Sequence, residues 1–166
     1  SSFNEISKNL LKSNKFSGIY LISSSSNNLS ENIASQNNQN GISLSNSNAN
    51  NIYSNNVDKN NNSGIWLNES NGNQIFENII SSNPTGVLLA NSSNNQVYHN
   101  NFQDNAEQAE DRDGTNSWDK GSNIGGNYWS DHMAIGNPSK GWSRVIKGGK
   151  MDNYPFQSQN GWLVSG

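Results

Sequence analysis

The sequence contains no cysteine and few hydrophobic residues. Because none of the 166 residues is Cys, a disulfide scaffold and a thiolate metal site are excluded. Hydrophobic residues make up 30% of the chain, and no apolar run approaches the ~20 residues that a membrane span requires. We therefore expect no membrane insertion.

Charge is also scarce. Only 14% of the residues are charged and the formal net charge is −3, so we expect no basic face for a phosphate backbone and no nucleic-acid partner. Asparagine and serine are abundant instead, a composition that is typical of disordered chains. The few apolar residues nevertheless keep fixed positions, which a disordered chain does not require.

A four-residue segment recurs along the chain. It consists of glycine, an apolar residue, a variable residue and another apolar residue, at 18–21, 41–44, 64–67 and 86–89. This pattern is typical of a short strand with one buried face, entered through a residue that tolerates a tight bend. Its period of 22–23 residues predicts a solenoid of stacked β coils.

A second set of positions keeps the same period. Inward apolar residues are expected at Ile6, Leu29, Ile52, Ile75 and Val97. Corner asparagines follow at Asn9, Asn32, Asn55, Asn78 and Asn100, and again at Asn14, Asn37, Asn60, Asn83 and Asn105, while Ser24, Ser47, Ser70 and Ser92 occupy another corner. Stacked coils place equivalent asparagines above one another, so we expect ladders of side-chain amides, with asparagine adopting the left-handed conformation that the bends require.

The regular pattern fades after Asn105. We predict coils over 1–118, with one last irregular rung at Gln108-Ala109, and an aromatic-rich C-terminal cap of the same domain over 119–166. A solenoid end exposes its core and an unpaired strand edge, which is why it needs a cover. The amino end shows no comparable segment, so we expect the tail of a longer solenoid and, in this form, an end-to-end dimer.

These blocks resemble the NosD-like group of parallel β-helix repeat proteins, also called CASH domains. The tail segments 116–119, 125–131 and 152–156 look like the end signature of archaeal secreted or cell-surface members of that group. The resemblance implies an all-β, right-handed parallel β-helix of five to six coils and an extracellular or cell-surface location. Copper, which the family name suggests, requires imidazole or sulfur ligands, and with only His99, His132, Met133 and Met151 available we expect no copper role.

Outward aromatic residues are the candidate ligand-binding groups. Tyr53, Phe76 and Tyr98 fall in one outward column of successive coils, and Tyr20 and Trp66 fall in another. Exposed rings on a rigid sheet suit the apolar faces of sugars, whereas stacking between coils would explain the Tyr53 column without any ligand. Trp66 is therefore the stronger candidate.

Acidic residues are scattered. Glu77, Asp104 and His99 are candidate catalytic groups, but no adjacent outward positions carry the pair of acids that glycosidases use. Asp111, Asp113 and Asn116 form a fragment of a calcium loop, for which a plain Asp-Gly turn is the alternative. Otherwise we expect no metal and no cofactor.

Three functions remain open from the sequence. The first is an extracellular module that binds or scaffolds a cell-envelope polysaccharide. The second is the C-terminal part of a disaggregatase-like polysaccharide hydrolase or lyase, with an active site partly in upstream coils. The third is an inert structural spacer.

Overall fold

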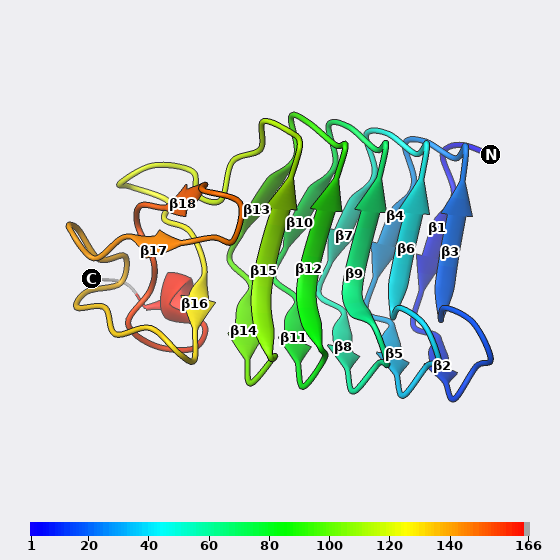
Figure 1. The fold of residues 1–166 in the computed structure, drawn as a ribbon, viewed down its shortest axis with the longest axis horizontal. Coiled ribbons are helices and arrows are strands. Elements are labelled where there is room, and N and C mark those ends of the chain that lie inside the picture. The colour runs from blue at the N-terminus through cyan, green and yellow to red at the C-terminus, as the bar shows by residue number, and fades with distance from the viewer. Residues whose placement is uncertain (165–166) are drawn as a thin grey trace.

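The computed structural model describes residues 1–164 and is a parallel β-helix (Figure 1). The chain passes through three short strands in each coil, and the coils stack along the long axis of the molecule, with the N-terminus at one end and the cap at the other. Among the described residues the only helical segment is the 3₁₀ turn η1 (Gly161–Leu163). The predicted fold class is confirmed. The predicted cap ends at residue 166, and residues 165–166 lie outside the described residues.

Three parallel sheets form the walls of the solenoid. The first contains β1 (Glu5–Ser7), β4 (Asn28–Ser30), β7 (Asn51–Tyr53), β10 (Gln74–Phe76) and β13 (Gln96–Tyr98). The second contains β2 (Leu10–Lys12), β5 (Ile33–Ser35), β8 (Asn56–Asp58), β11 (Ile79–Ser81), β14 (Asn101–Gln103) and β16 (Tyr128–Trp129). The third contains β3 (Ile19–Ile22), β6 (Ile42–Ser45), β9 (Ser63–Asn68), β12 (Thr85–Ala90) and β15 (Glu107–Arg112).

The core is a set of vertical columns of aliphatic side chains. Ile42 pairs with Ile65 in the third sheet, and Ile52 pairs with Ile75 in the first. All four side chains are fully buried. A narrow cylinder needs few apolar residues per coil, so a sequence with few hydrophobic residues can still fill its interior.

Both predicted asparagine ladders are present. Asn55 donates from its side-chain amide to Asn78 Oδ1 at 3.0 Å, and Asn78 donates in the same way to Asn100 Oδ1. The backbone N–H of Asn55 donates to the same Asn78 Oδ1. The side-chain amide of Asn55 also donates to the main-chain carbonyl of Leu29 in the preceding coil. Each buried amide is therefore satisfied within the stack.

A third ladder runs beside the serine corner and was not predicted. It links residues in all coils, namely Asn4, Asn27, Asn50, Asn73, Asn95 and Asn116.

Each of the three ladders ends on an aspartate. Beside the serine corner the last member is Asn116, which donates to Asp111 Oδ1 at 2.9 Å. At the bend between the first and second sheets the last member is Asn127, whose backbone N–H donates to Asp152 Oδ2 at 2.7 Å. At the bend between the second and third sheets Gln108 ends the ladder and donates to Asp131 Oδ1 at 3.4 Å. The N–H groups of every ladder point towards the cap, so a carboxylate there receives the positive end of each chain of amides.

The left-handed residues at the bends are not the ladder asparagines, and that expectation was wrong. In the bend between the first and second sheets, the residue with positive φ is the one immediately before the ladder, at Lys8, Glu31, Ser54, Glu77 and His99. Its φ values lie between 55° and 58°. The asparagine itself stays out of this region because its backbone N–H must point along the stack towards the next Oδ1.

The last coil is regular, contrary to the predicted irregular rung. β15 pairs with β12 through Val87 and Ala109, and Gln108 occupies the glycine column after Gly86. The side chain of Gln108 fits because it turns to the ladder end and accepts from Asn105 Nδ2 at 2.8 Å.

Large rings close the bore at the cap. Trp129 stacks on Phe102 with ring centroids 4.2 Å apart, and Trp118 packs against both rings. Phe156 is buried further out, while Trp142 is 39% exposed and is not part of the plug. The antiparallel hairpin of β17 (Arg144–Val145) and β18 (Met151–Asp152) completes the cap (Figure 1).

Candidate functional site

The predicted aromatic column on the first sheet is a continuous stack. The rings of Tyr53 and Phe76 are 5.0 Å apart and inclined by 5°, and those of Phe76 and Tyr98 are 5.4 Å apart and inclined by 9°. Both faces of Phe76 are therefore covered by neighbouring rings. The far side of Tyr98 carries Lys120, whose Nζ lies 4.2 Å from the ring centroid. This column offers ring edges, rather than faces, to a ligand.

The outward column of the third sheet differs. It runs through Tyr20, Ser43, Trp66, Leu88 and Glu110 in successive coils. Among residues 1–164, neither Tyr20 nor Trp66 stacks on another ring. Tyr20 is 54% exposed and Trp66 is half-buried.

Ser43 separates the two rings of this column. It points outward yet is only 2% exposed, so neighbouring side chains cover it. Its hydroxyl is held by Ser17 Oγ at 2.9 Å and by Asn40 Nδ2 at 3.0 Å. In this column Trp66 is therefore flanked by two residues without rings, Ser43 on one side and Leu88 on the other.

At its cap end the third sheet is covered by charged groups. Glu110 pairs with Arg112 at 2.6 Å and with Lys147 at 3.7 Å, the latter from the loop of the β17–β18 hairpin. The Arg112 guanidinium lowers the pKa of Glu110. The open part of the face therefore extends from β3 to β12.

The candidate catalytic residues do not form a pair of acids. Glu77 and His99 occupy the same left-handed bend position in successive coils, a relation that the sequence reasoning did not identify. Asp104 lies at the next bend, after β14, with its backbone N–H bonded to Ser130 Oγ. Glu77 and Asp104 are both exposed and are held by different corners of the solenoid.

His99 belongs to the cap contact rather than to an acid cluster. Its ring stacks on Trp162 at 5.1 Å with an inclination of 4°, and its Nε2 lies 2.8 Å from Ile124 O. Burial lowers the pKa of His99, against smaller opposing effects of the Ile124 carbonyl and Glu77. A neutral imidazole at neutral pH follows from this direction.

The calcium-loop residues have other partners. Asp111 is buried and uses one carboxylate oxygen for Asn116 Nδ2 and the other for Trp118 Nε1, both at 2.9 Å. Asp113 lies exposed in a turn with φ of 55°. Asp111 and Asn116 thus terminate a ladder, and Asp111 also holds Trp118 of the plug.

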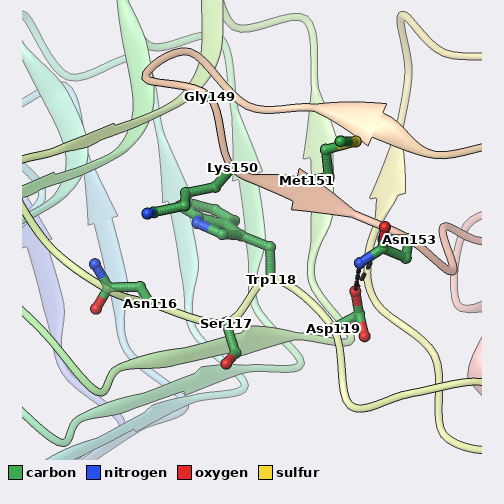
Figure 2. Close-up of a pocket in the computed structure, with 8 residues that line it drawn as sticks. All are labelled: Asn116, Ser117, Trp118, Asp119, Gly149, Lys150, Met151 and Asn153. Carbon is green, nitrogen blue, oxygen red and sulfur yellow. Dashed lines mark hydrogen bonds between the residues drawn. The ribbon is translucent and has the colours of Figure 1, made fainter.

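Two hollows lie at the junction of coils and cap. Figure 2 shows the first, of about 390 Å³, where Asp119 and Asn153 are joined by hydrogen bonds beside Trp118 and Lys150. Each carboxylate oxygen of Asp119 accepts a hydrogen bond from a backbone N–H, one from Gly121 and one from Asn153. This carboxylate therefore has a structural role. The second hollow, of about 540 Å³, lies beside His99 and Trp162.

The sequence reasoning missed the contribution of the cap to these sites. Lys120, Lys140 and Trp162 come from a segment without periodicity, and no spacing connects them with His99 or Tyr98. In the sequence, the only indication that these residues belong to a site was their type, one aromatic ring and two cations in an aromatic-rich tail.

The chain matches the model of a known protein family. A family model described as "Periplasmic copper-binding protein (NosD)" matches residues 1–134. A comparison with curated proteins finds no match.

Two solved structures are similar, both A-modules of mannuronan C-5 epimerases from Azotobacter vinelandii. AlgE6 matches with a TM-score of 0.47 and 16% identity over 68% of this chain, and AlgE4 with 0.42 and 15% over 65%. The chain spans 39% and 38% of the length of those two structures.

The residues present do not fit copper. Each of the two histidines has its Nε2 within hydrogen-bond distance of a main-chain carbonyl, His99 with Ile124 O and His132 with Trp142 O. Residues 1–164 contain no group of three His, Cys, Asp or Glu side chains that could hold a metal ion. In the same residues no helix is long and apolar enough to cross a membrane.

Proposed function

Because the chain belongs to the NosD family, we propose that it is a β-helix module that binds a polysaccharide of the cell envelope along the third sheet. The observation that carries the proposal is the pair of unstacked rings, Tyr20 and Trp66, on one face of a rigid parallel sheet.

Ring availability decides between the two aromatic columns. A pyranose packs its C–H face on the face of an aromatic ring while its hydroxyls remain in water. Phe76 has no free face, since Tyr53 and Tyr98 cover both sides. Tyr20 and Trp66 have no such partners among the described residues, which makes them the platforms for sugar.

The spacing of the platforms suits a chain of sugars rather than a single one. Tyr20 and Trp66 are two coils apart, which corresponds to about 9.6 Å between their backbones at ~4.8 Å per coil. This is about the length of a disaccharide. Ser43, in the coil between them, carries no ring, so the two platforms would contact sugars at either end of such a unit.

An extracellular or envelope location supports this function. The matched family is described as periplasmic, and envelope polysaccharides are found in and beyond that compartment. The scarcity of charge, 14% of residues, and the formal net charge of −3 suit a sugar ligand better than a nucleic acid.

The positions of the acidic side chains favour binding of a polysaccharide over its cleavage. A glycosidase places two carboxyl groups about 5–9.5 Å apart on either side of one bond. Glu77 and Asp104 occupy different bends, and Asp111, Asp119 and Asp152 accept structural hydrogen bonds. A depolymerase would need a pair of catalytic carboxyl groups, and Glu77 and Asp104 are held at different bends.

The test combines affinity electrophoresis in gels containing neutral or acidic polysaccharides with sizing of the glycan after incubation. We expect retardation without shortening. Trp66→Ala and Tyr20→Ala should each reduce retardation, whereas Ile22→Ala, which removes an exposed apolar side chain from the next outward position of β3, should not.

Three results would contradict the proposal. Shortening of the glycan that is lost in Glu77→Gln or Asp104→Asn would indicate the depolymerase. No retardation on any polysaccharide would indicate an inert spacer. Retardation that survives loss of both Tyr20 and Trp66 would place binding elsewhere.

A further inference from the structure

The hollow of about 540 Å³ beside the first sheet has the composition of a sugar site. The indole of Trp162 forms its aromatic wall, and the buried ring of Phe156 meets that indole edge to face at 5.6 Å. His99 stacks on Trp162 and fixes the plane of that indole. His99 and Phe156 thus hold the indole in a fixed position, as a platform for a pyranose requires.

Polar groups converge on the same space. Ser122 and Asn123 line it, and within the described residues neither side chain forms a hydrogen bond. Asn137 lines it too, and its Oδ1 accepts the backbone N–H groups of Gln157 and Ser158, which holds the wall in place. Hydroxyl and amide groups at the rim of an aromatic wall are the partners that sugar hydroxyls require.

Charge gives the hollow a preference. Lys140 is exposed at its edge, and among residues 1–164 no carboxylate lies within 4.0 Å of its ammonium group. It is the one lysine or arginine among the residues that line the hollow, and none of those residues is acidic. An unpaired cation beside an aromatic wall favours a ligand that carries a carboxylate.

We propose that this hollow binds a hexuronate residue, with the pyranose ring against Trp162, the carboxylate on Lys140 and hydroxyls on Ser122 and Asn123. The site is separate from the Tyr20–Trp66 face, which belongs to a different sheet. Its volume accommodates a disaccharide, so the end of an acidic oligosaccharide is the expected occupant.

The test is a titration of the whole chain with digalacturonate. Binding is measured by calorimetry and by the shift of the Trp162 indole N–H signal in NMR spectra. Digalactose, which has hydroxymethyl groups in place of carboxylates, is the neutral control. We expect digalacturonate to bind and to shift the Trp162 signal, and Lys140→Ala to weaken binding about fivefold to tenfold, the loss of one charged contact. Lys150→Ala, a lysine at the other hollow, should leave binding unchanged.

Several outcomes would overturn the site: equal binding of digalactose, no effect of Lys140→Ala, or no binding at all. Trp162→Ala should abolish binding, and a melting curve shows whether the cap of that variant is intact. Because Lys140 is exposed, its variant keeps the fold and tests the site independently of Trp162→Ala. Binding that depends on Trp66 instead would assign the ligand to the third sheet and reject this site without affecting the proposed function.

Discussion

Substitution of Asn60 by Ala measures how strongly the ladders hold the coils together. Asn60 donates to Ala34 O at 3.0 Å and to Asn83 Oδ1 at 3.1 Å, and its own Oδ1 accepts the backbone and side-chain N–H groups of Asn37. In Asn60→Ala, two buried N–H donors of Asn37 lose this acceptor, and the carbonyl of Ala34 loses a donor.

The expected cost follows from the orphaned donors. Each buried group left without a partner costs about 1–3 kcal/mol, so two donors give about 2–6 kcal/mol. The neighbouring residue provides a matched control, because Asn61 is exposed and makes a single side-chain bond to Asn38 Oδ1 at 2.9 Å. Water replaces that bond, so Asn61→Ala should cost less than about 0.5 kcal/mol.

Guanidinium unfolding followed by tryptophan fluorescence and circular dichroism is the assay. The midpoint should fall clearly for Asn60→Ala and stay within error for Asn61→Ala, with similar slopes for both variants. A changed slope would mean that coils unfold separately, as solenoids can. Equal midpoints for the two variants would refute the reasoning that the ladders are a main stabilising feature.

Three further predictions concern packing and pH. Gly64→Ala should destabilise by about 1–3 kcal/mol, because a Cβ there would lie 2.7 Å from Gly86 O; an unchanged melting temperature would contradict this. Phe76→Ala should lose two ring stacks, about 1–3 kcal/mol in all, and Trp66→Ala should lose less, since Trp66 has no ring partner among residues 1–164; thermal melts compare them. Burial raises the pKa of Asp152 from 3.8 to about 7, so the fold binds this proton more tightly than the unfolded chain does. Stability should therefore rise as the pH falls from about 7 to about 4, by at most about 4 kcal/mol, and Asp152→Asn should flatten this dependence in unfolding curves measured across that range.

The periodic part of the molecule is predictable because one rule determines it: residues one coil apart in the sequence lie directly above one another. Ile42 over Ile65 and Asn55 over Asn78 both follow from spacing alone. The rule does not predict which residues are buried where neighbouring positions carry the same residue type. Asn50 is buried in a ladder and Asn51 is only partly buried, on the outer side of its strand, yet both positions carry asparagine.

Some bends escape prediction for a different reason. The left-handed position is filled by Ser54, Glu77 and His99 in successive coils, residues that share no preference for that conformation. Tertiary stacking imposes the backbone there, and the side chain only has to tolerate it. The sequence therefore places the corner correctly but not the strained residue within it.

The candidate sites divide in the same way. The self-stacking of the Tyr53 column and the lack of a ring partner for Trp66 among residues 1–164 follow from their coil positions. The hollow at Trp162 depends on how an aperiodic tail folds back, which brings residues 99 and 162 together. No local pattern encodes that contact, because it depends on cap packing as a whole.

The common direction of the three ladders gives the solenoid a polarity of growth. At the cap, Asp111, Asp131 and Asp152 accept the last N–H groups and close the series. At the opposite end, Asn4, Asn9 and Asn14 present amide carbonyls to which no residue among 1–164 donates. Additional coils can therefore be joined in register only at that end, and an engineered longer version would have to be built outward from it.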